Sequence, residues 1–249
     1  MPSFSRRGLA AALVLAIAGV APAAPAQIAP DRPNLGPPAR TLRELMGRYM
    51  AWRGPAFEQL QSLHERAYFE GAAGRRSGAI WMDRVGRRRV EVAGADGREV
   101  RVAGPAGAWR VGADGKPADD PGAAEAARRY AALEFGDALM GRDGAEVALA
   151  GTADAQDHTW SVVRVTFGDA DAYEALIDPA IGLLCCYRIT EHGVTREILL
   201  TDWRLVDGVR IAFAQLTRQG ADASGVRLTS VEVNPPLSPT LFEKPAAAN

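Results

Sequence analysis

The sequence predicts an α+β fold in which one meandering antiparallel sheet of about a dozen short strands carries two helices. Three observations support this prediction. Hydrophobic residues recur at helical spacing in two segments and at strand spacing in most of the others. Short connections rich in glycine join successive strand segments, as antiparallel hairpins require. No linker interrupts the chain after residue 40, so we expect residues 41–249 to form one domain.

Residues 1–26 have the features of a signal peptide. Arg6 and Arg7 supply a positive start, the apolar run Leu9–Ala21 follows, and Ala24-Pro25-Ala26 provides a cleavage site. Such a run is too short to cross a membrane, which needs about 20 residues. We therefore expect a soluble mature protein outside the cytoplasm. Residues 5–9 approximate a twin-arginine signal, so both ordinary secretion and export of the folded chain are open.

Residues 27–40 contain four prolines and are expected to form an extended N-terminal arm. A helix is predicted after this arm, at Leu42–Trp52. It begins with a capping box, in which the Thr41 hydroxyl accepts from the amide of Glu44 and the Glu44 carboxylate reaches back to Thr41. Apolar residues then recur at helical spacing, and Gly54-Pro55 ends the segment.

From Leu63 the hydrophobic period changes to two, which indicates strands. The Asp96-Gly97 pair is typical of a tight hairpin, because glycine adopts the positive φ that such a turn needs. The first block of predicted strands comprises His64–Gly71, Gly78–Val85, Arg88–Ala93, Arg98–Ala103 and Ala108–Val111.

A second helix is predicted at Pro121–Met140, because Asp119 or Asp120 can cap it and apolar residues line one face. Strands resume after Gly144, and Asp207-Gly208 is another candidate hairpin turn. The second block of predicted strands comprises Glu146–Ala150, Thr159–Phe167, Ala172–Asp178, Leu183–His192, Thr195–Thr201, Val209–Thr217 and Gly225–Val233.

Composition limits the classes of function. The 249-residue chain has a formal net charge of −1, which gives no electrostatic reason to expect nucleic acid as a partner. The two cysteines are the neighbours Cys185 and Cys186. We interpret them as buried apolar residues rather than a disulfide, because neighbours on a strand point to opposite faces.

The sequence contains no recognisable catalytic or metal-binding motif. None of the histidines His64, His158 and His192 has a partner at metal-ligand spacing, and Ser77 and Ser224 lie outside G-x-S-x-G. We therefore predict no enzymatic activity, no metal and no cofactor. A catalytic site assembled from residues distant in sequence remains an alternative.

Two features allow two interpretations each. Several strands carry large apolar residues on both faces, which either form a core with the helices or leave a concave face free for an apolar ligand. Arginines cluster at Arg75-Arg76, Arg84 and Arg87–Arg89. This cluster either contacts anionic lipid headgroups or forms a solvated hairpin edge that discourages strand pairing.

Three turn motifs in the second half of the chain resemble those of a known superfamily. Residues 173–183 (YEALIDPAIGL) form a strand, Asp-Pro, Gly-Leu hairpin. Residues 201–211 (TDWRLVDGVRI) approach D-x-R-x-V-D-G-V-x-x-P, with Ile211 near the family's proline. Residues 231–245 approach V-x-x-N-x-P … F-x-x-P. In this order, the motifs resemble the LolA/LolB-like superfamily of periplasmic lipoprotein carriers.

The resemblance implies a strongly curved antiparallel half-barrel with helices on its concave side and an apolar interior that receives lipid acyl chains. It implies a non-catalytic periplasmic carrier or chaperone for lipoprotein acyl chains or another lipid-like ligand in outer-membrane biogenesis. We expect a monomer. The alternative is a periplasmic sensor or regulatory module of RseB-like type that binds an inner- or outer-membrane protein.

Strand alternation supplies a set of residues expected to line this cavity, with two residues of the second helix as its lid. The assignment depends on register, since a slip of one residue reverses the faces of a strand. The set comprises Trp81, Val90, Val92, Val100, Val102, Trp109, Phe167, Tyr173, Cys185, Tyr187, Ile211 and Phe213, with Phe135 and Leu139 as the lid.

Overall fold

The computed structural model describes residues 38–245 except 73, 96, 113, 143, 156–157, 169–171 and 192. The predicted signal peptide and most of the predicted arm lie outside the described residues. The helices are α1 (Leu42–Arg53), α2 (Ala123–Glu134) and the 3₁₀ turns η1 (Phe57–Gln59) and η2 (Pro239–Phe242). The strands are β1 (Ser62–Gly71), β2 (Gly74–Asp83), β3 (Arg88–Gly94), β4 (Gly97–Gly104), β5 (Gly107–Val111), β6 (Pro117–Asp119), β7 (Glu146–Ala155), β8 (His158–Thr166), β9 (Ala172–Ile177), β10 (Leu184–Glu191), β11 (Val194–Val206), β12 (Val209–Gln219) and β13 (Asp222–Val233).

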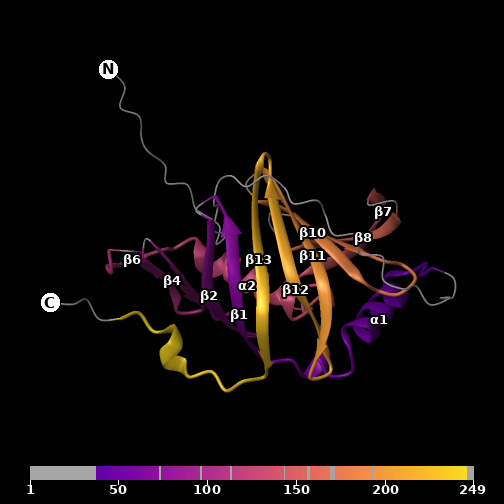
Figure 1. Cartoon of the computed structure of the whole chain (residues 1–249). Helices are drawn as coiled ribbons and strands as arrows, with labels where there is room; N and C mark the ends of the chain where they lie inside the picture. The colour runs from indigo at the N-terminus through magenta and orange to yellow at the C-terminus, as the bar shows by residue number, and fades with distance from the viewer. Residues whose placement is uncertain are drawn as a thin grey trace.

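All described strands belong to one antiparallel sheet (Figure 1). Its order is β6-β5-β4-β3-β2-β1-β13-β12-β11-β10-β9-β8-β7, so each half of the chain is a meander and the β1–β13 pair joins the halves. The sheet is open, because its end strands β6 and β7 do not pair with each other. The predicted α+β fold with a curved antiparallel sheet is confirmed.

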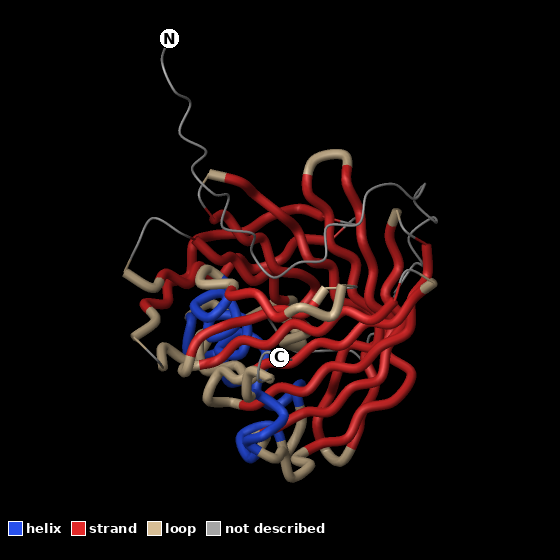
Figure 2. The backbone as a smooth tube through the Cα atoms, turned by 90° about the vertical axis from the view of Figure 1, so that its left-hand side faces the viewer, coloured by secondary structure: helices blue, strands red, loops and turns tan. Residues whose placement is uncertain are grey.

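The sheet is strongly curved, and its strands bend around the helices in Figure 2. Strands β4 and β11 are six strand spacings apart in the order of the sheet. In a flat sheet they would lie about 29 Å apart, yet side chains from both line the same cavity. Curvature therefore creates an enclosed concave face, which the main hydrophobic core and both helices occupy.

Helix α1 begins at Leu42, as predicted, and ends at Arg53, one residue beyond the predicted end, and its Glu44 carboxylate bonds the amide of Arg40 where the prediction had Thr41. The Thr41 hydroxyl accepts a 3.2 Å hydrogen bond from the Glu44 amide, and the Glu44 carboxylate accepts from the Arg40 amide at 2.8 Å. The C-cap of the helix is Gly54, whose φ is 114°. A close approach at Gly182 (φ 81°) fixes α1 on the sheet, because a Cβ there would lie 2.3 Å from the backbone carbonyl carbon of Arg48.

Two elements differ from the predictions. Helix α2 is shorter than Pro121–Met140, because Gly136 adopts a φ of 76° directly after the C-cap Phe135, and a left-handed glycine there ends a helix. The short strand β6 was not predicted from the sequence.

The two-residue turn at Asp207-Gly208 is confirmed, since both residues have positive φ. No helix in the described part of the chain is long and apolar enough to span a membrane.

The convex face carries its own apolar clusters, which accounts for the large apolar residues on both faces of several strands. Val100, Val102 and Trp109 pack against Phe242 of η2, so the C-terminal segment covers this part of the sheet. Cys185 and Cys186 are free and buried beside Trp160 in a second cluster. Their interpretation as buried apolar residues is confirmed.

Candidate functional site

A cavity of about 110 Å³ lies between α2 and the concave face. Strands from both halves of the chain and one helix contribute to it, so it exists only in the folded sheet. A smaller void of about 10 Å³ adjoins it through Tyr130, Ile198 and Gln215. The cavity is lined by Phe69, Glu70, Arg88, Val90, Arg101, Ala126, Ala127, Tyr130, Arg196, Ile198, Gln215, Thr217, Ser224, Gly225 and Val226.

The N-terminal part of α2 is attached to the sheet through small side chains. Ala123 and Ala127 pack on Ala103 of β4 and Ala108 of β5. A buried methyl-sized group contributes about 0.8 kcal/mol, whereas a large apolar side chain contributes about 1.5–3 kcal/mol. The opposite side of α2 contacts Phe167 through two arginines, at 5.4 and 5.6 Å from the ring. Arg129 is also buried at 8% exposure, and it interacts with the Tyr173 hydroxyl of β9. The apolar contacts of this part of the helix are therefore small, and charged side chains supply the rest of its attachment.

The C-terminal end of α2 is anchored more firmly. Arg53 of α1 is only 1% exposed and donates to the Tyr49 hydroxyl at 3.0 Å and to the Glu134 carbonyl at 3.3 Å. The Tyr187 hydroxyl donates to the Leu133 carbonyl at 3.2 Å. A buried arginine that holds a helix end is costly to release, since it would lose its partners in a low-dielectric environment. The two ends of α2 thus differ in the kind of apolar contact they make with the rest of the protein.

Ionisable groups surround the base of the cavity. The Arg88 guanidinium lies 4.8 Å from the centroid of the Tyr130 ring. Glu65 is 3% exposed on the same face of the sheet. Burial, and then the charge of Glu134, raises the pKa of Glu65 to about 8, although Arg88 opposes this rise. Glu65 is therefore largely protonated and neutral at pH 7.

Most members of the predicted cavity set lie on the concave face but within the packed core. Val90 lines the cavity itself, Tyr187 lines the adjoining void, and Phe167 packs against the core beside Tyr173 at 5.4 Å between ring centroids. The remaining concave members, including the predicted lid residues, are buried in the core: Val92, Phe135, Leu139, Tyr173, Ile211 and Phe213.

The other members lie on the convex face, which corrects the predicted grouping. Val90 is paired with Arg101, so the alternating residues Val100 and Val102, and Trp109 opposite Val102, point away from the cavity. Trp81 also lies on the convex face, where it stacks on His64 at 4.9 Å. Cys185 occupies a register shift between Leu184 and Cys186, and this irregularity places both cysteines in one convex cluster.

Sequence reasoning missed the arginines of the cavity. The arginine cluster of β2 and β3 does not lie at a sheet edge, because both strands have neighbours on both sides. Most of its members form ion pairs, such as Arg84 with Asp137 and Arg87 with Asp83, both at 2.6 Å. Arg88 differs from these, since it shares the face of Val90 and lines the cavity. The sequence offered one signal for this placement, because Arg88 and Val90 are two residues apart on a predicted strand and therefore share a face.

The site shows no metal-binding arrangement: among the described residues, no group of three or more His, Cys, Asp or Glu side chains is placed to hold an ion. His158 lies 3.1 Å from Asp178, but this pair is part of the far end of the sheet and not of the cavity.

Comparison with known proteins supports the fold. No family model and no curated protein matches the sequence. Among solved structures, the chain is similar to a LolA superfamily protein from Nitrosomonas europaea, with 9% identity, a TM-score of 0.56 and coverage of 83% of this chain and 99% of that chain. A DUF1329 family protein from Desulfovibrio piger gives 10% identity, a TM-score of 0.58 and coverage of 81% and 97%. The chain therefore has the LolA/LolB-like fold that its turn motifs predict.

Proposed function

We propose that this protein is a non-catalytic periplasmic carrier that holds a lipid-like ligand, such as lipoprotein acyl chains, between α2 and the concave face of its sheet. The observation that carries the proposal is the cavity beneath α2, which combines apolar strand residues with a helix that packs on the sheet through alanines at its N-terminal end. Ligand sites are typically concave and mostly apolar, with a few polar groups. The signal peptide predicted from the sequence supports the periplasmic location.

The volume of the cavity requires α2 to act as a lid. A cavity of about 150 Å³ accommodates benzene, so 110 Å³ holds a group of comparable size and not a long acyl chain. The firm anchor at Arg53 and Glu134 and the small alanine contacts at Ala123 and Ala127 favour a pivot about the C-terminal end of α2. This movement also has to release the interaction of Arg129 with Tyr173. An outward movement of the N-terminal end extends the cavity along the sheet.

The chemistry of the lining favours binding over catalysis. Ser224 and Thr217 line the cavity, but within the described residues no histidine or carboxylate accepts a hydrogen bond from either hydroxyl. Burial raises the pKa of Tyr130 above its ordinary value, so its hydroxyl stays protonated and is a poor base at neutral pH.

Native mass spectrometry of the protein purified from its own periplasm tests the proposal. We expect a bound lipid mass, and we expect Val226→Trp to lose it because the indole fills the cavity. Leu216→Trp is the matched control, since Leu216 is also half-buried but its β12 position faces the convex side. Purified protein that carries no lipid and takes none from vesicles would contradict the proposal. Association with a membrane protein without lipid would instead support the regulatory alternative.

A further inference from the structure

Three arginines from strands far apart in the sheet converge on the cavity. Arg88 lies on β3, Arg101 on β4 and Arg196 on β11, and all three line the same space. Arg88 and Arg101 are diagonal neighbours, because Val90 is opposite Arg101 and Ala103 is opposite Arg88. Arg196 reaches the cavity from β11, which lies on the other side of the β1–β13 pair in the curved sheet. Three arginines therefore line one small volume from opposite sides of the curved sheet.

Their hydrogen-bonding capacity is only partly used. The buried Nε atoms of Arg88 and Arg196 have no hydrogen-bond partner among the described residues. One side of Arg196 pairs with Glu191 at 2.8 Å. Neither Arg88 nor Arg101 forms an ion pair with any carboxylate in the described part of the chain. Buried donors without partners are costly and uncommon in native proteins.

Glu191 offsets the charge of Arg196, but the positive charges of Arg88 and Arg101 are not cancelled by an ion pair in the described part of the chain. Glu70 lines the cavity, but its carboxylate forms an ion pair with Arg75, with 3.6 Å between Oε1 and Nε. Glu65 is largely neutral at pH 7, because burial and Glu134 raise its pKa to about 8. Arg101 is also directly opposite Arg110 across β4 and β5, and like charges at opposed positions are unfavourable. An anion in the cavity would offset the positive charge of Arg101. It would also accept hydrogen bonds from the unused donors of Arg88 and Arg196.

Beside these arginines and polar residues such as Gln215, Thr217 and Ser224, the cavity has an apolar wall. Phe69, Val90, Ile198 and Val226 form the wall opposite α2 and offer no charge to a ligand. We propose that the cavity is specific for an anionic amphiphile, with a carboxylate or phosphate headgroup bound by Arg88, Arg101 and Arg196 and an alkyl chain along these four residues. This inference rests on the proposed carrier function and specifies its ligand class.

Displacement of the neutral fluorescent probe N-phenyl-1-naphthylamine tests the inference. The competitors are palmitate, palmitoyl lysophosphatidic acid, the uncharged 1-hexadecanol and inorganic phosphate. We expect the two anionic lipids to bind roughly 10- to 100-fold more tightly than hexadecanol, as charge-assisted hydrogen bonds predict. Arg88→Gln and Arg101→Gln should each weaken the anionic lipids about 10-fold and leave hexadecanol unchanged.

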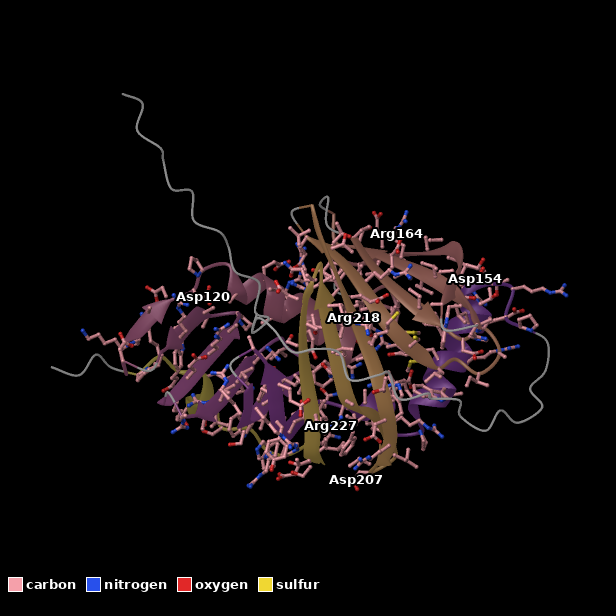
Figure 3. The ribbon with its side chains drawn as sticks, turned by 45° about the horizontal axis from the view of Figure 1, so that its top comes forward. Asp120, Asp154, Arg164, Asp207, Arg218 and Arg227 are labelled. Atoms are coloured by element: carbon pink, nitrogen blue, oxygen red, sulfur yellow. The ribbon has the colours of Figure 1, made fainter. Side chains whose placement is uncertain are left out.

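The matched control is Arg227→Gln, which removes an exposed charge from β13 on the convex face (Figure 3). It should change none of the affinities. Equal affinity for palmitate and hexadecanol, or an equal loss of both in the arginine variants, would overturn the inference while the carrier function stands. Inorganic phosphate that binds as tightly as the anionic lipids would also overturn it, because the alkyl chain of the lipid would then contribute nothing to the affinity. Absence of binding by the probe and by every lipid would contradict the carrier function itself.

Discussion

A disulfide between α2 and the turn before β3 should lock the lid. A Cβ placed on Gly86 would lie 3.5 Å from the Cβ of Arg128 on α2. Disulfides join residues whose Cβ atoms are about 3.5–4.5 Å apart. The double variant Gly86→Cys/Arg128→Cys should therefore form a disulfide when oxidised. It would fix the middle of α2 on the sheet and prevent the outward movement that a long acyl chain requires.

The magnitude follows from the loop that the disulfide closes. Closing the chain between residues 86 and 128 should stabilise the oxidised form by about 4 kcal/mol relative to the reduced form. Gly86 has a φ of 91°, where a cysteine costs roughly 1–3 kcal/mol. This cost is common to both redox forms and cancels in their comparison. Urea unfolding with and without reductant measures the difference.

Palmitate binding is the functional assay for the locked lid. We expect the oxidised double variant to bind palmitate at least 10-fold more weakly than the same protein after reduction. The single variant Arg128→Cys controls for the lost contacts of Arg128 with Glu125 and Phe167. Equal binding by the oxidised and reduced forms would refute the pivot of α2, because the ligand would then enter without it.

Two further predictions concern stability. Gly182→Ala should destabilise the protein by at least about 2 kcal/mol more than Gly193→Ala, because both glycines have positive φ but only the new Cβ at Gly182 meets α1; equal melting temperatures would contradict this. The contribution of Glu65 to the free energy of unfolding should be full below pH 4.5 and be lost as the pH rises to about 8. Between these values the carboxyl group releases its proton in the unfolded state and retains it in the folded state. In urea unfolding at pH 5 and 8.5, Glu65→Gln should remove this dependence, and an unchanged slope would show that Glu65 does not cause it.

The fold was accessible from the sequence because local chemistry specifies it. The Thr41 cap, the Asp207-Gly208 turn and the left-handed Gly182 each act within a few residues or at one close contact. Antiparallel neighbours then follow from short connections. The same reasoning extended α2 too far, because nothing in the alternation of its alanines shows that Gly136 would adopt positive φ and end the helix.

The cavity was less accessible because it depends on which strands meet across the curved sheet. Alternation assigns two faces to each strand but does not show which face is concave, so Val100 and Val102 were grouped with Val90. The irregularity at Cys185 also reversed a face that strict alternation would assign. Arg88 appeared to belong to a surface cluster. Alternation puts it on the face of Val90, but only the folded sheet shows that this face is the concave one.

Photo-crosslinking tests the location of the ligand most directly. A palmitate analogue with a diazirine at the end of its chain would be irradiated with the protein, and the modified residues would be identified by peptide mass spectrometry. We predict saturable labelling at the cavity walls, on Phe69, Tyr130, Ile198 or Val226, with loss of label when excess palmitate competes. Labelling confined to the convex cluster around Trp109, or labelling that palmitate does not compete, would contradict a ligand site beneath α2.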